Sequence, residues 1–145
     1  MEIKGLHVAI VHRRFALGGA EEVSRQTACL FSDLGIHTHF FAETHIETEW
    51  TLPADSLIDL CLLPQGMRLW TQESALYLVH AFKERGVKVL IIPIALRNDY
   101  LPLIQSAGVK IIYWCHSSPL WELVDRRERA SYKAHHPWHK NLYSL

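Results

Sequence analysis

A chain of 145 residues is long enough to form one domain with its own core. Hydrophobic residues make up 49% of the chain and charged residues 21%, a balance that argues against disorder. Lys plus Arg and Asp plus Glu both number 15, so the charge of the whole chain provides no attraction to nucleic acid or to an anionic membrane.

The first part of the chain predicts one βαβ unit. Residues 6–12 are rich in branched side chains and predict a buried strand, and residues 13–19 predict a loop that ends in a glycine pair. The apolar residues of segment 20–34 recur at helical spacing, and Gly35 is the expected stop of that helix. Residues 36–42 predict the second strand.

The same alternation continues toward the C-terminus. Further strands are expected at residues 57–63, 87–94 and 109–115, and further helices at 71–85 and 98–107, with Asn98 as the cap of the last one. We therefore predict an α/β fold: a three-layer, Rossmann-like doubly wound, mainly parallel sheet over residues 6–120. A helical and irregular tail is expected at residues 121–145.

Ligands of such sheets bind outside the carboxyl ends of the strands. This rule directs attention to the loops at residues 13–19, 64–69 and 116–119, and to Asn98 and Asp99.

The first of these loops contains Gly18 and Gly19 at a strand-to-helix turn. The free N–H groups of the following helix can bind phosphate there. The spacing is neither G-x-G-x-x-G nor a Walker loop, which removes the main support for NAD binding or ATP hydrolysis. A turn that serves only tight packing explains the pair equally well on spacing alone.

The segment W-C-H-S-S-P places His116, Ser117 and Ser118 at the end of the fifth strand. A histidine there can hold a sugar hydroxyl, and the serines can donate to phosphate or sugar oxygens. The alternative is a strand-end histidine bonded to the backbone, with Ser118 as a helix cap before Pro119.

Cysteine and histidine spacing indicates no metal site. Cys29, Cys61 and Cys115 form no C-x-x-C pair, and we expect reduced, buried thiols. The three histidines within residues 135–139 are expected in a polar tail. The N-terminus leads directly into a strand pattern without a signal-peptide pattern, so we expect a cytoplasmic protein.

The stretch V-A-I-V-H-R-R-F-A-L-G-G-A-E-E, followed by a helix pattern and G-I-H-T, resembles the opening of retaining GT-B glycosyltransferases of family 4. Those enzymes commonly begin with a strand, a G-G-A-E type turn, an amphipathic helix and a G-H-x-V strand. The strand that ends in His116 is a second, looser match. The resemblance covers most of residues 6–120.

The resemblance implies a donor nucleotide sugar held between two Rossmann-like domains. The amides of Gly18 and Gly19 would approach the donor diphosphate, and His116 would contact the donor sugar as the catalytic residue. Ser117 and Ser118 would add donor contacts.

The acceptor, a carbohydrate or a lipid-linked molecule, would bind this N-terminal domain, with Arg13, Arg14 and Asn98 as its candidate contacts. The two arginines could bind acidic groups of the acceptor or of the donor, and a solvated loop explains them equally well. The nucleotide sugar is a substrate, and no cofactor or metal is implied. Relatives that act on lipid-linked acceptors also suggest association with the inner face of a membrane.

The resemblance places the nucleotide pocket and an E-x7-E pair in a second domain. The pair Glu122 and Glu128 has the wrong spacing for that motif. We therefore expect a C-terminal domain outside this chain, and no turnover by the 145 residues alone.

Three other functions stay open. A stand-alone flavodoxin-like or receiver-like binding module would have the same fold, although Arg13 and Arg14 stand where a receiver needs acidic residues. A GT-B epimerase would differ only in the second domain. A basic helix at residues 126–133 could bind nucleic acid or a partner protein, but a solvated face explains it better. The five tryptophans indicate either an uncovered apolar surface or core packing.

Overall fold

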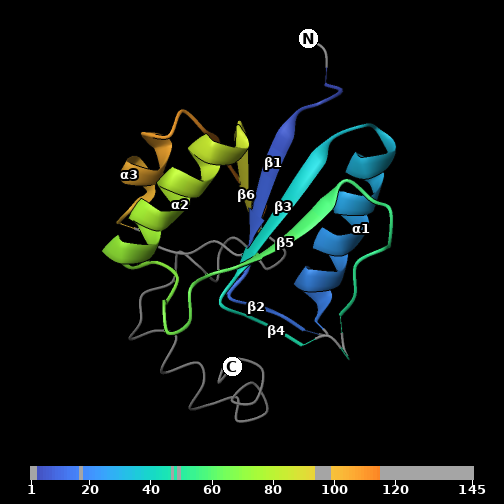
Figure 1. The fold of residues 1–145 in the computed structure, drawn as a ribbon, viewed down its shortest axis with the longest axis horizontal. Coiled ribbons are helices and arrows are strands. Elements are labelled where there is room, and N and C mark those ends of the chain that lie inside the picture. Colours follow the sequence, from blue (N-terminus) through green and yellow to red (C-terminus); the bar gives the residue numbers. More distant parts are fainter. Residues whose placement is uncertain (1–2, 17, 47, 49, 94–98, 115–145) are drawn as a thin grey trace, which may run out of the picture.

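A computed structural model describes residues 3–16, 18–46, 48, 50–93 and 99–114. Its centre is a five-stranded parallel sheet in the order β5-β3-β1-β6-β7 (Figure 1). The strands are β1 (His7–Val11), β3 (His37–Ala42), β5 (Ile58–Leu62), β6 (Val89–Ile92) and β7 (Lys110–Tyr113).

Helices cover both faces of this sheet. Helix α1 (Gly19–Asp33) lies on one face, and α2 (Gln72–Arg85) and α3 (Leu101–Gln105) lie on the other (Figure 1). Side chains of β1 alternate between the two layers: Ala9 and Val11 pack in the cluster of α2, whereas Val8 and Ile10 pack in the cluster of α1. The predicted three-layer, Rossmann-like fold is therefore confirmed.

The ends of α2 show how local sequence defines a helix. Thr71 caps its start, since the Thr71 hydroxyl accepts from the Ser74 N–H at 3.2 Å and the Ser74 hydroxyl accepts from the Thr71 N–H at 3.0 Å. Gly86 ends it with a φ of 66°, a left-handed conformation that costs glycine least.

The prediction of a loop over all of residues 13–19 is partly wrong. Within it β2 (Arg14–Phe15) pairs in parallel with β4 (Thr44–His45) at the carboxyl edge of the main sheet (Figure 1). These strands continue the pairing of β1 with β3, and they are too short to show an alternating pattern. The buried Phe15 ring packs these strands against the core: it stacks on the Trp50 ring, with the ring centroids 4.5 Å apart.

The expected cap of α3 is also wrong. The cap residue is Tyr100, whose side chain does not cap the helix, and Pro102 lies in the first turn. A proline in a first turn removes an N–H that has no helical partner there, so this start needs less capping. Asn98 itself lies outside the described residues.

The tryptophans and thiols fall into several environments. Trp50 is buried, and Trp70 and Trp114 are partly buried against the two core clusters. Cys29 and Cys61 are free, half-buried thiols. Trp121, Trp138, Cys115 and the predicted basic helix lie outside the described residues.

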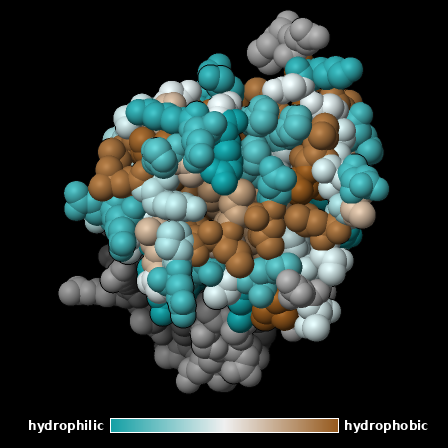
Figure 2. All heavy atoms as spheres, in the orientation of Figure 1, coloured by the Kyte–Doolittle hydropathy of each residue, from teal (hydrophilic) through white to brown (hydrophobic). Residues whose placement is uncertain are grey.

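Polar residues cover most of the face shown in Figure 2, and a band of hydrophobic residues runs between them. No helix in the described part of the chain is long and apolar enough to cross a membrane.

Candidate functional site

A cavity of about 1140 Å³ opens at the carboxyl edge of the sheet. Val11 at the end of β1 and Ile92 at the end of β6 contribute to its wall, together with residues that follow β3 and β5. The chain leaves β1 for β3 on one side and later places β6 on the other side, so the strand order reverses at this point. Open α/β sheets bind ligands at such a reversal, which is where the sequence predicted a site.

Glu43 organises one wall of this cavity. Its carboxylate, 11% exposed, accepts a hydrogen bond from the Leu69 N–H at 2.7 Å through Oε1. The other oxygen, Oε2, lies 3.5 Å from Arg13 Nε and 3.6 Å from Arg68 Nη1. A single carboxylate thus connects three segments of the chain.

The two arginines around Glu43 remain largely open to solvent. Their side chains are 68% exposed at Arg13 and 66% exposed at Arg68. Each guanidinium has five N–H donors, so the contact with Glu43 leaves donors on both for a further anion. Arg14 is exposed and also lines the cavity.

His12 follows β1 directly and is 3% exposed. Its Nε2 lies 2.8 Å from the Ser24 hydroxyl of α1, which fixes the orientation of the ring. Its Nδ1 lies 4.0 Å from Glu21 Oε1, and both side chains line the cavity. This arrangement holds an imidazole and a carboxylate side by side at the start of α1.

The glycine pair differs at its two positions. Gly18 is the extended cap of α1, and a Cβ built on it would overlap the Glu21 carboxylate. A Cβ on Gly19 would meet no atom within 4 Å. The overlap at Gly18 is with the end of a flexible side chain, which can move aside, and the space beside Gly19 is open to an approaching ligand. Any anion bound at this helix start would share it with the Glu21 carboxylate.

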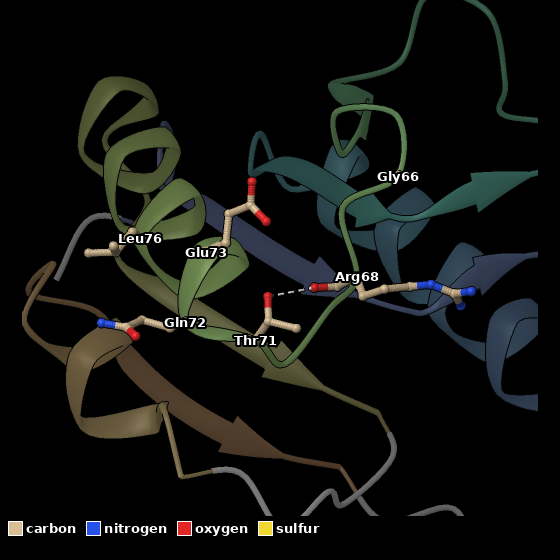
Figure 3. Close-up of a pocket in the computed structure, with 6 residues that line it drawn as sticks. All are labelled: Gly66, Arg68, Thr71, Gln72, Glu73 and Leu76. Atoms are coloured by element: carbon tan, nitrogen blue, oxygen red, sulfur yellow. Dashed lines mark hydrogen bonds between the residues drawn. The ribbon is translucent and has the colours of Figure 1, made fainter.

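A shallower pocket of about 570 Å³ lies at the start of α2 (Figure 3). Gly66, Thr71 and Glu73 line it together with Arg68, which borders both cavities. In Figure 3 the Arg68 side chain extends away from α2, while the Thr71 hydroxyl donates to the Arg68 carbonyl at 3.0 Å. The guanidinium therefore serves the larger cavity.

Of the residues predicted from sequence, Gly18, Arg13 and Arg14 line the larger cavity, and Gly19 begins the adjacent helix. Asn98, His116, Ser117 and Ser118 lie outside the described residues. The cavity residues that were not predicted individually include His12, Glu21, Glu43, Arg68 and Trp70, although Arg68 lies in the predicted loop at residues 64–69. His12 and Glu43 each follow the last residue of a strand, so the carboxyl-edge rule could have marked both.

A histidine cluster occupies the opposite, amino end of the sheet. His7 stacks on His37 with ring centroids 4.5 Å apart, and its Nδ1 lies 2.9 Å from His39 Nε2. His39 Nδ1 lies 3.1 Å from Asp59 Oδ2.

Burial is the main cause that lowers the pKa of both His7 and His39, and the neighbouring histidines lower both further, while Asp59 opposes the shift. Within the described ranges no group of three or more His, Cys, Asp or Glu residues is placed to hold a metal ion.

No protein-family model matches this chain, and no curated protein matches it. Among solved structures, the C-terminal domain of a hydrogenase from Pyrococcus furiosus is similar with a TM-score of 0.40 and 13% identity. The match covers 75% of this chain and 90% of that domain. A likeness at this level says nothing about a reaction or a ligand.

Proposed function

We propose that this chain is the N-terminal, acceptor-side domain of a nucleotide-sugar-dependent glycosyltransferase. The observation that carries the proposal is the cavity at the strand-order reversal, walled by Arg13, Arg14 and the start of α1. The resemblance, which covers most of residues 6–120, assigns the acceptor and the donor diphosphate to these same positions.

The chemistry of this cavity suits positioning rather than bond breaking. Arg13 and Arg14 hold an acidic or phosphorylated acceptor, and the open side of Gly19 accepts the donor diphosphate. His116, Ser117 and Ser118 complete the donor contacts. The second domain contributes the nucleotide pocket and the E-x7-E pair, so catalysis arises from orientation and from stabilisation of the leaving diphosphate.

The proposal includes the cellular setting that the resemblance implies. The acceptor is a carbohydrate or a lipid-linked molecule, the protein works in the cytoplasm, and the inner face of a membrane is a place where it meets such acceptors. Nucleic acid is not a partner.

The test follows the reading frame past the codon for Leu145 and assays the protein it encodes. We expect a second domain with an E-x7-E pair, and release of nucleoside diphosphate from one of the UDP-, GDP- or ADP-linked sugars. Residues 1–145 alone should release none.

Arg13→Gln together with Arg14→Gln should raise the KM for acceptor in that assay. Arg25→Gln is the matched control, because Arg25 pairs with Glu22 along α1 at 2.7 Å and does not line the cavity. A stop codon after Leu145 without a partner gene, or no release from any donor, would leave a stand-alone binding module as the better account.

A further inference from the structure

The segment that follows β5 contains a strained residue at the larger cavity. Trp70 has a φ of 64°, a left-handed conformation that bulky side chains rarely adopt. Its side chain is half-buried and lines the cavity. Such outliers persist only where neighbouring contacts hold them, and they gather at ligand sites.

Three contacts hold the backbone around Trp70. Glu43 accepts from the Leu69 N–H at 2.7 Å, and the Leu69 side chain, 7% exposed, packs in the α2 core cluster. The Thr71 hydroxyl donates to the Arg68 carbonyl at 3.0 Å. The residues on both sides of Trp70 are therefore fixed, and the indole both packs against the α2 core cluster and lines the cavity.

The cavity thus presents an aromatic surface and cationic groups together. The indole supplies a flat apolar face, and Arg13 and Arg68 supply donors around one partly buried carboxylate. Two guanidiniums against one carboxylate leave a net positive charge at this wall. A ring that carries an anionic group satisfies both features.

Acceptor groups in the same cavity distinguish a sugar ring from a nucleobase. The Glu21 and Thr44 residues line it, and a carboxylate and a hydroxyl are both able to accept hydrogen bonds from ring hydroxyls. A polyhydroxylated ring offers many such donors, whereas a pyrimidine base offers few.

We propose that the Arg68–Trp70 segment selects a phosphorylated sugar or cyclic polyol, with the ring against Trp70 and the phosphate between Arg13 and Arg68. This deepens the proposed function, because the ligand would be its acceptor, but the binding step stands without the transfer reaction. Glu43 acts as a positioning residue that holds both arginines and the segment in place.

Calorimetric titration of the 145-residue chain tests the proposal with hexose monophosphates and inositol monophosphates. Inorganic phosphate, glucose and UMP are the comparison ligands. At least one sugar or inositol phosphate should bind about ten-fold more tightly than all three, since the ring and the anion are held together. Equal affinity for inorganic phosphate, tighter binding of UMP, or no binding by any member of the panel would overturn the proposal.

Variants separate the two halves of the site. Arg68→Gln should weaken binding of the sugar phosphate and of inorganic phosphate by about ten-fold, as expected for a charge-assisted contact. Trp70→Gly, which suits the backbone conformation, should weaken only the sugar phosphate. Arg25→Gln is the matched control and should change neither; an equal loss in Arg25→Gln and Arg68→Gln would reduce the effect to net charge and overturn the assignment.

The outcomes also separate this proposal from the proposed function. If the sugar phosphate binds with this pattern but the full-length protein transfers no sugar, the transferase proposal is rejected and the binding-site proposal is retained. If the full-length protein transfers sugar and neither Arg68→Gln nor Trp70→Gly changes that activity, the binding-site proposal is rejected and the transferase proposal is retained.

Discussion

The two ends of the sheet use similar residues in opposite ways. At the carboxyl edge, the carboxylate of Glu43 is 11% exposed, and the arginines that it contacts extend into a cavity and solvent. At the amino edge, the ring of His39 is 4% exposed, and its partner Asp59 is 65% exposed. A partly buried carboxylate with exposed cations leaves positive charge available for a ligand. A buried imidazole instead makes its own protonation unfavourable, so the amino edge affects stability rather than binding.

The largest expected effect is on the free energy of unfolding. It tests whether the residues that stabilise the carboxyl end differ from those that bind a ligand there. Trp50 is 3% exposed and contacts the rings of Phe15 and Phe40 at 4.5 and 5.2 Å. Trp50→Ala should lower the free energy of unfolding by ~3–5 kcal/mol in urea titrations, because it removes a large buried ring. Arg13→Gln should lower it by less than about 1 kcal/mol, as for exposed ion pairs. Similar losses in both variants would contradict this division.

The second effect is the response of the amino end to acid. The folded-state pKa of His39 is lowered from 6.5 by burial, so below that pH the unfolded chain binds more protons than the folded chain. The free energy of unfolding is therefore not reduced by this residue above about pH 6.5. It falls as the pH decreases toward the folded-state pKa, by at most ~1.4 kcal/mol per pH unit from this residue.

Urea unfolding at about pH 7.5 and about pH 5.5 measures this response. His39→Asn should flatten the pH dependence, since it removes the ring whose protonation is unfavourable. His80→Asn, at an exposed position of α2, is the matched control and should keep the slope of the unchanged chain. Parallel curves for all three proteins would show that the histidine cluster does not control acid stability.

A third effect concerns strain at the carboxyl end. Trp70→Gly and Trp70→Ala both remove the indole, but only glycine tolerates a φ of 64° without cost. The glycine variant should be more stable than the alanine variant by ~1 kcal/mol, the reverse of their usual order. Equal free energies of unfolding would mean that the backbone relaxes when the indole is lost.

The smallest effect is electrostatic. The Glu21 carboxylate lies beside Gly18 at the start of α1, where it would repel a diphosphate. Glu21→Gln should raise the affinity for pyrophosphate about five-fold, given ~1 kcal/mol between unit charges at about 4 Å in water. Glu22→Gln, one residue further along α1, is the control and should give a smaller change. No difference between the two variants would place the anion away from this helix start.

Much of the fold could be predicted because its signals are local. Apolar runs marked all five strands of the main sheet, helical spacing marked α1 and α2, and glycines marked helix ends such as Gly86. The paired strands β2 and β4 were not predicted. Each has two residues, which is too few to show an alternating pattern, and their pairing depends on the register of β1 with β3.

The sequence could indicate where the candidate site lies, but not all of the residues that line it. The carboxyl-edge rule led to Arg13, Arg14 and Gly18 and to the loop that contains Arg68, whereas the contact between Arg68 and Glu43 forms only because their segments meet across the fold. The histidine cluster was missed for the same reason, because His7 faces His37 only through the parallel register of β1 and β3.

The strand order has a further consequence during synthesis of the protein. When residues 1–46 have left a ribosome, β1, α1 and β3 are available, but the second neighbour of β1 is β6, which ends at Ile92. At ~5–20 residues per second, the remaining segment takes several seconds to emerge. Throughout that interval one edge of the central strand is unpaired, which makes the newborn chain the form most exposed to edge-to-edge aggregation.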